Sequence, residues 1–182
     1  MQRIASLDPS HAKGKVRQQL DGVAKALGAT PNMFTAMARS PALLDGYLAL
    51  NTALSAGLLN ARLREQIALA VAGANGCDYC ASAHTELGKR AGVVAEDLAA
   101  GLRGRASDQK VAAALQFACA VNAARGRISD ADLQRVRDAG WEDAAIGEII
   151  GHVALNVLTN SFNNVADTKI DFPIVRAAGG PG

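Results

Sequence analysis

Helix-start and helix-stop residues recur along the whole sequence, and the segments between them carry apolar residues at a period close to 3.6. Residues 16–27 form one such segment, and Gly28 follows it as a stop signal. The residues typical of helix starts are Thr30-Pro31, Ser40-Pro41, Asn60, Ser107 and Ser129. The spacing of these signals predicts a succession of helices with short connections.

The side-chain composition favours the same fold class. Of the 182 residues, 38 are Ala and only 7 are aromatic, which suits helices that pack closely and argues against a strand-rich fold. We therefore predict an all-α, single-domain bundle of about eight helices. The longest helix is expected to begin near Asp143 and to lie centrally in the core or against another subunit, because it is apolar over much of its circumference.

The predicted domain boundaries follow from where the helical pattern begins and ends. Residues 1–14 are expected to form an N-terminal arm, and residues 15–170 the helical domain, with a redox motif at residues 65–84. Residues 171–182, with two prolines and several glycines, are expected to be a non-helical or partly disordered tail.

Charge and hydropathy exclude several classes of partner. With 19 basic and 17 acidic residues, the chain lacks the basic surface that nucleic-acid binding requires. No apolar run reaches the roughly 18 residues of a membrane span, and the N-terminus has no apolar signal core. We therefore expect a cytoplasmic protein in a reducing environment, where three cysteines do not indicate a structural disulfide framework.

One motif stands out from the helical background: Cys77, Cys80 and His84 at the start of a predicted helix from about residue 77 to residue 90. At about 100° per residue the three lie at roughly 0°, 300° and 340°, on one helical stripe. The helix N-terminus favours a thiolate at Cys77, whereas His84, one turn beyond Cys80, can accept a proton from Cys80. These arguments leave open which sulfur attacks first.

The spacing of the two cysteines also permits a disulfide across one turn, which would store electrons without a bound cofactor. Glu65 lies twelve residues before Cys77, on the preceding predicted helix. If the Asn75-Gly76 turn folds the two helices against each other, the Glu65 carboxylate could face His84 and keep its imidazole oriented and basic.

The pattern Glu-x11-Cys-x2-Cys-x3-His resembles the carboxymuconolactone decarboxylase superfamily, and within it the alkyl hydroperoxidase D branch of peroxidase-related proteins. The resemblance covers roughly residues 28–172, and residues 61–92 are its specific part. Further matching segments are Thr30-Pro31-Asn32, Ser40-Pro41, Ala139-Gly140-Trp141 and Asn163-Asn164.

The resemblance implies a homo-oligomeric, all-helical thiol peroxidase that acts on a small hydroperoxide. By this likeness Cys80 would be the peroxidatic sulfur and Cys77 the more exposed resolving sulfur that meets the reductant. His84 and Glu65 would relay protons, and a dihydrolipoamide-like dithiol or a thioredoxin-like protein would reduce the disulfide. This sequence departs from the branch at Tyr79, where a second histidine is usual. A phenol is a poor base at neutral pH, although Tyr79 could donate a hydrogen bond to a leaving oxygen.

Three alternative hypotheses accompany the peroxidase reading. Cys77, Cys80 and His84 could bind zinc, with Glu65 or His152 as the fourth ligand. The protein could instead catalyse the acid–base chemistry of a carboxymuconolactone decarboxylase, or it could sense redox state without catalysis. His152, on the last helix, is either a hydrogen-bonded core residue or an auxiliary site residue.

Overall fold

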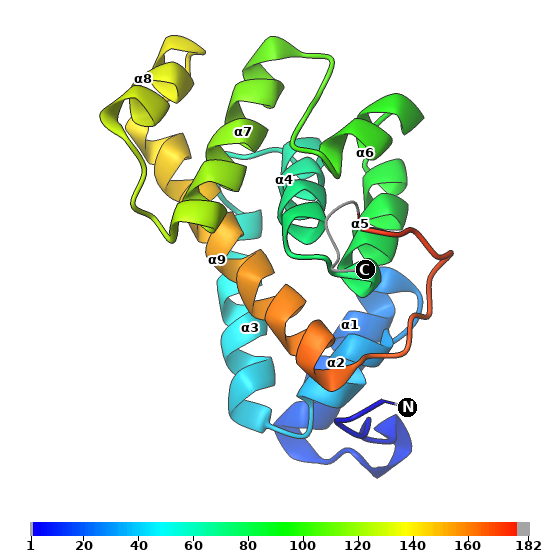
Figure 1. The fold of residues 1–182 in the computed structure, drawn as a ribbon. Helices are drawn as coiled ribbons and strands as arrows, with labels where there is room; N and C mark the ends of the chain where they lie inside the picture. Colours follow the sequence, from blue (N-terminus) through cyan, green and yellow to red (C-terminus); the bar gives the residue numbers. More distant parts are fainter. Residues whose placement is uncertain (1, 178–182) are drawn as a thin grey trace.

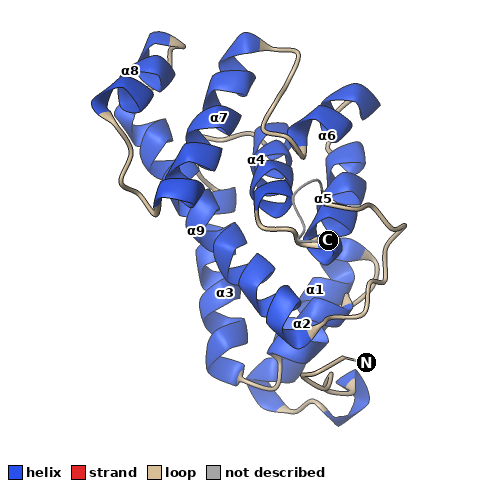
Figure 2. Cartoon of the chain, in the orientation of Figure 1, coloured by secondary structure: helices blue, strands red, loops and turns tan. Residues whose placement is uncertain are grey.

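The computed structural model describes residues 2–177 and shows them as an all-α fold, as the sequence predicts (Figure 1). Its nine α-helices, one more than the approximate count of eight, are α1 (Gly14–Leu27), α2 (Asn32–Met37), α3 (Pro41–Ser55), α4 (Ala61–Ala74), α5 (Asp78–Arg90), α6 (Ala95–Gly101), α7 (Gln109–Ala124), α8 (Asp130–Asp138) and α9 (Asp143–Ala166). A single 3₁₀ turn, Pro9–His11, precedes α1. Loops join the helices, and residues 2–177 contain no strand (Figure 2).

Most predicted capping residues begin their helices as expected. Ser40 accepts a hydrogen bond from the Leu43 amide at the start of α3, and Asn60 accepts one from the Leu63 amide at the start of α4. Ser129 forms a reciprocal capping box at the start of α8. These side chains satisfy amide groups that would otherwise lack partners in the first turn of each helix.

Two predicted capping residues are wrong by one position. Pro31, rather than Thr30, occupies the cap position of α2. Asp108, rather than Ser107, caps α7, because the Ser107 hydroxyl donates to the Asp97 carboxylate at 2.9 Å. A carboxylate is as good a cap as a hydroxyl, so the sequence pattern did not separate the two neighbours.

Helix α4 lies in the middle of the fold and packs against α5, α6, α7 and α9. An apolar cluster fills the space between α4, α7, α8 and the first half of α9, and its largest fully buried members are Leu59, Ile67, Val71, Leu115, Val136 and Ile149. This packing confirms that the longest helix is central in the core.

A second buried cluster joins α1, α2 and α3 to α5 and to the segment after α9. It includes Leu20, Met37 and Leu44, and it also includes both cysteines of the motif. The predicted redox motif therefore lies inside a packed part of the molecule, close to the helices that begin the chain (Figure 1).

The turn between α4 and α5 decides how the motif meets the rest of the chain. Gly76 has a φ of +62°, a conformation that glycine adopts without strain. Asn75 accepts a hydrogen bond from Asn122 and donates one to Asn160, so the turn is tied to both α7 and α9. The tight turn places α4 and α5 side by side, as the Asn75-Gly76 dipeptide predicts.

Within residues 2–177, the segments before α1 and after α9 are mostly non-helical. The predicted N-terminal arm contains one 3₁₀ turn, and α1 begins at Gly14. After α9 the chain continues without helix to residue 177, and the last part of the predicted tail, 178–182, lies outside the described residues. Every helix within residues 2–177 is too short or too polar to span a lipid bilayer.

Candidate active site

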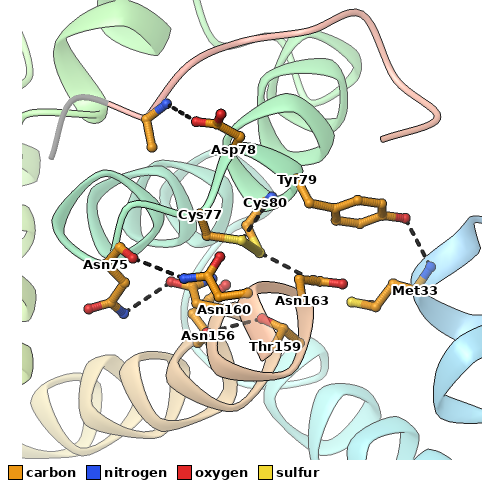
Figure 3. Close-up of a disulfide and its surroundings, with 12 residues drawn as sticks. Met33, Asn75, Cys77, Asp78, Tyr79, Cys80, Asn156, Thr159, Asn160 and Asn163 are labelled. Atoms are coloured by element: carbon orange, nitrogen blue, oxygen red, sulfur yellow. Dashed lines mark hydrogen bonds between the residues drawn. A yellow bond between two sulfur atoms is a disulfide. The ribbon is translucent and has the colours of Figure 1, made fainter. Parts of the chain in front are cut away.

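The two cysteines of the motif meet at the N-terminus of α5. Cys77 is the cap residue, and α5 itself begins one residue later than predicted, at Asp78. The Cys77 sulfur accepts a hydrogen bond from the Cys80 amide at 3.2 Å, and a disulfide joins the two sulfurs (Figure 3). One helical turn therefore holds both sulfurs in bonding contact.

His84 and Glu65 form a hydrogen-bonded pair between α5 and α4. The distance from His84 Nδ1 to Glu65 Oε2 is 2.7 Å, so the pairing expected from the motif is present. The two side chains are 22% and 21% exposed, which leaves this pair in contact with solvent. An ionised carboxylate only accepts hydrogen bonds, so Nδ1 is the donor in this pair, and in the neutral imidazole Nε2 is then the nitrogen with the lone pair.

A cavity of about 240 Å³ brings most of the predicted site residues together. Its lining includes Cys80, His84, Glu65, Tyr79 and His152. Other polar groups come from α3, α4 and α9: Tyr47, Asn51, Ser55, Arg64, Asn156, Thr159 and Asn163. Apolar walls complete it: Leu27, Pro31, Met33, Phe34, Leu87, Leu155 and Phe172. The cavity thus joins a sulfur, a histidine–carboxylate pair and an apolar surface.

The expectation that Cys77 is the more exposed sulfur is wrong for this chain. Cys77 has no exposed surface and does not line the cavity, whereas Cys80 is 2% exposed and does. The reason is the tight turn before α5: the Cys77 amide donates to the Ala72 carbonyl at 3.0 Å, which holds Cys77 against the last turns of α4.

Asn163 is a site residue that the motif analysis did not assign. Its Nδ2 lies 3.3 Å from the Cys80 sulfur and donates a hydrogen bond to it (Figure 3). Asn163 is the last member of a buried polar row on α9, which comprises Asn156, Thr159, Asn160 and Asn163. Polar residues at intervals of three and four in an otherwise apolar helix were the signal that could have revealed it.

Tyr79 does not take the place of the missing histidine. Its hydroxyl accepts a hydrogen bond from the Met33 amide at 3.1 Å and bonds to the Asp171 carboxylate. Burial raises the pKa of Tyr79 well above its ordinary value. With both partners engaged, the phenol links α5 to α2 and to the segment after α9.

Tyr47, on α3, brings a second phenol to the cavity. Burial and the nearby Glu65 charge raise the pKa of Tyr47 to about 12, so its hydroxyl keeps its proton at neutral pH. Within residues 2–177 this hydroxyl has no hydrogen-bond partner, and its ring packs edge-on against Phe34. Tyr47 is therefore a free hydrogen-bond donor beside the His84–Glu65 pair. Nothing in its local sequence distinguishes it from a core tyrosine.

His152 lies in the wall of the cavity and is 3% exposed. Burial and the positive charge of Arg64 lower its pKa, while Glu148, a bond to the Leu54 backbone and Glu65 oppose the shift. Its Nε2 is buried without a hydrogen-bond partner among the described residues. His152 is thus a neutral histidine at the edge of the site, and one of its two ring nitrogens has no hydrogen-bond partner among the described residues.

The zinc hypothesis gains no support from the geometry. In the part of the chain that the structure describes, no three His, Cys, Asp or Glu side chains are grouped so as to hold a metal ion.

Comparisons with known proteins agree with the motif. Residues 41–123 match the carboxymuconolactone decarboxylase family. A peroxidase-related protein from Ralstonia eutropha JMP134 with the alkylhydroperoxidase AhpD core is 26% identical, with a TM-score of 0.84 over 93% of this chain and 92% of that one. No curated protein matches the chain.

Two further solved structures share the fold. A peroxidase-related protein from Silicibacter sp. TM1040 is 23% identical, with a TM-score of 0.78 over 91% of both chains. The debrominase Bmp8 in complex with 2,3,4-tribromopyrrole is 22% identical, with a TM-score of 0.78 over 92% of this chain and 91% of that one. Residues 41–123 are thus similar to the carboxymuconolactone decarboxylase family, and the chain shares its fold with a peroxidase-related protein that has the AhpD core.

Proposed function

We propose that the protein is a thiol-dependent peroxidase that cycles between the Cys77, Cys80 dithiol and its disulfide. The observation that carries this proposal is the position of Cys80 in one cavity with the His84–Glu65 pair, with an amide donor of Asn163 on its sulfur. A thiolate, a base and hydrogen-bond donors are the groups that peroxide reduction needs.

In the first step His84 Nε2 accepts the proton of the Cys80 thiol, and Glu65 stabilises the resulting imidazolium. The Cys80 thiolate attacks the terminal oxygen of the hydroperoxide, the O–O bond breaks, and the proton from His84 goes to the departing oxygen. Cys80 becomes a sulfenic acid, and the peroxide leaves as an alcohol. Tyr47 is placed to donate a hydrogen bond to that oxygen as it acquires charge.

In the second step the Cys77 sulfur attacks the Cys80 sulfenic acid. An S–S bond forms, the S–O bond breaks, and water leaves. The contact between the two sulfurs at the N-terminus of α5 supports this step, because closure of the disulfide across one turn requires no rearrangement of distant parts of the chain. An external dithiol then returns the pair to the reduced state.

The apolar walls favour an organic hydroperoxide as the substrate. Leu27, Phe34 and Leu155 line the cavity together with the reactive sulfur, and they offer contacts to an alkyl or aryl group. Hydrogen peroxide would gain nothing from these contacts. We therefore expect a lower KM for an apolar hydroperoxide than for hydrogen peroxide.

A free-thiol count tests the proposal. Fully reduced, metal-free protein is mixed with one equivalent of cumene hydroperoxide, denatured and assayed. We expect three thiols to fall rapidly to one, with Cys77 and Cys80 joined, and the matched Cys119→Ser variant to fall from two thiols to none. Cys80→Ser should abolish turnover. Persistence of all three thiols would refute the peroxidase.

A decarboxylase-type reaction is the second candidate, because the His84–Glu65 pair is complete without the cysteines. If the thiols persist, acid–base chemistry at this pair is the function to test. The assay is proton exchange at the carbon next to the carboxylate of a small lactone diacid, with His84→Gln as the inactive control.

A further inference from the structure

We infer that the reducing thiol enters through the same cavity as the peroxide and attacks Cys80, so that Cys77 acts only as the leaving group. The inference rests on the proposed peroxidase cycle and reverses the order that the family resemblance suggests for reduction. In that order the resolving sulfur, Cys77, would meet the reductant.

Access to the two sulfurs is unequal. Cys77 has no exposed surface, because it packs in the apolar cluster of α5 and is held against α4 through the Ala72 carbonyl. Cys80 lines the cavity, and the half-buried His84 and Glu65 connect that cavity with solvent. A thiol that follows the cavity therefore reaches Cys80 without displacing packed side chains.

Cys77 is also a suitable leaving group. Thiol–disulfide exchange is faster when the leaving thiolate is stabilised. Cys77 caps α5 and already accepts the Cys80 amide hydrogen at 3.2 Å, so the helix N-terminus stabilises negative charge on its sulfur as the disulfide breaks. Attack at Cys77 would instead require entry into a closed core.

Reduction of the disulfide takes two exchange steps. A thiolate of an external dithiol bonds to the Cys80 sulfur, the Cys77–Cys80 bond breaks, and Cys77 leaves as a thiolate. The second thiolate of the reductant then attacks the reductant sulfur of the mixed disulfide. Cys80 is released as a thiolate, and the reductant leaves as its own disulfide, so two electrons pass from the dithiol to the protein.

This route restricts which reductants can reach the disulfide. A thiol on the surface of a folded protein cannot touch a sulfur that is 2% exposed at the end of a cavity. A free dithiol, or one at the end of a slender arm, fits a cavity of about 240 Å³. Because both reactants use one entrance, they should compete for it.

Mapping the first adduct tests the inference. Oxidised Cys119→Ser protein is mixed with glutathione, and samples are quenched at short times with acid and alkylated with iodoacetamide. Mass-spectrometric fragmentation then shows which cysteine carries glutathione. Extrapolated to zero time, we expect glutathione on Cys80 and the alkyl group on Cys77 in more than nine molecules of ten. Glutathione on Cys77 in half or more of the molecules would overturn the inference.

Steady-state kinetics supply the second readout. With a small dithiol as reductant and the hydroperoxide already saturating, a further rise in hydroperoxide concentration should raise the apparent KM for the dithiol without changing kcat, as expected for competition at one entrance. A KM that stays constant when the peroxide is saturating would contradict the shared route. The adduct map requires no peroxide, so a failure of the peroxidase proposal would be seen in the thiol count and not in this map.

Discussion

Both halves of α9 bury side chains, but the buried side chains are mainly apolar in the first half and mainly polar in the second. Its first half carries Ile146, Ile149 and Val153, which pack with α4 and α7 in the first apolar cluster. Its second half carries the row Asn156, Thr159, Asn160 and Asn163, and the last of these donates to the Cys80 sulfur. One helix therefore supplies core packing at one end and part of the candidate site at the other.

The polar row lowers the stability of the fold and contributes a side chain to the candidate site. Asn160 Nδ2 and Asn163 Oδ1 are buried without hydrogen-bond partners among the described residues. Such unpaired polar atoms lower the stability of the fold, and leucine at these positions would avoid that loss. The first half has no such atoms apart from His152 at its end. We therefore expect substitutions in the first half to change stability, and substitutions at Asn163 to change reactivity.

The largest expected effect is on stability and comes from the apolar half. Ile149→Ala should lower the free energy of unfolding by about 3 kcal/mol, because it leaves a void in a fully buried cluster. Urea denaturation measures the loss. The matched control is the exposed neighbour in Ile150→Ala, which should change stability by less than about 0.5 kcal/mol. If the rate of peroxide reduction per folded molecule also fell in Ile149→Ala, the first half of α9 would contribute to reactivity as well, which contradicts this division.

The second-largest effect is on the rate of thiol oxidation and comes from the polar half of α9. Asn163→Leu keeps the side-chain shape but removes the donor to the Cys80 sulfur, a bond that is charge-assisted and worth about 2 kcal/mol when Cys80 is a thiolate. The rate of thiol oxidation by hydroperoxide in stopped flow should fall roughly 30-fold. The control Ser161→Leu lies on the exposed side of the same turn and should leave the rate unchanged. Equal losses in both variants would mean that Asn163 acts through folding alone.

A smaller effect separates the two phenols. Tyr47→Phe removes a donor that faces the cavity, and kcat/KM for the hydroperoxide should fall about tenfold with little change in melting temperature. Tyr79→Phe removes the bond to the Met33 amide, so it should instead lower the free energy of unfolding by about 1 kcal/mol. A reversal of these two results would assign Tyr79 to the chemistry.

The smallest effect is a pH dependence at the boundary between the halves. The native pKa of His152 is lowered from 6.5, chiefly by burial and by Arg64, so the unfolded chain binds its proton more readily. Stability linked to His152 is complete above pH 6.5 and is lost as the pH falls below it toward the lowered native pKa.

His152→Gln should therefore show a flatter decline of unfolding free energy between pH 7 and pH 5 than the unchanged protein. Urea denaturation across this range measures the decline. The control His11→Gln alters an exposed histidine in the N-terminal arm and should leave the slope as it was. An unchanged slope in His152→Gln would show that this histidine is protonated equally in both states.

Local chemistry made most of the fold predictable. A cap such as Asn60 or Ser129 acts within the first turn of its own helix, so the sequence alone located the starts of α4 and α8. The stripe of Cys80 and His84 follows from helical periodicity in the same way. Even here the sequence pattern predicts Ser107 instead of Asp108 as the cap of α7, because the pattern does not show that Ser107 bonds to Asp97 of another helix.

The sequence by itself determined the helical class, the order of the helices and the motif of the candidate site, because each depends on residues within one or two turns. Only the tertiary structure decided that Cys77 has no exposed surface and that Cys80 lines the cavity. It also decided that Asn163 and Tyr47 join the site. Those facts depend on the crossing of α3, α5 and α9, which brings together side chains far apart in the chain, and periodicity within one helix contains no information about its neighbours.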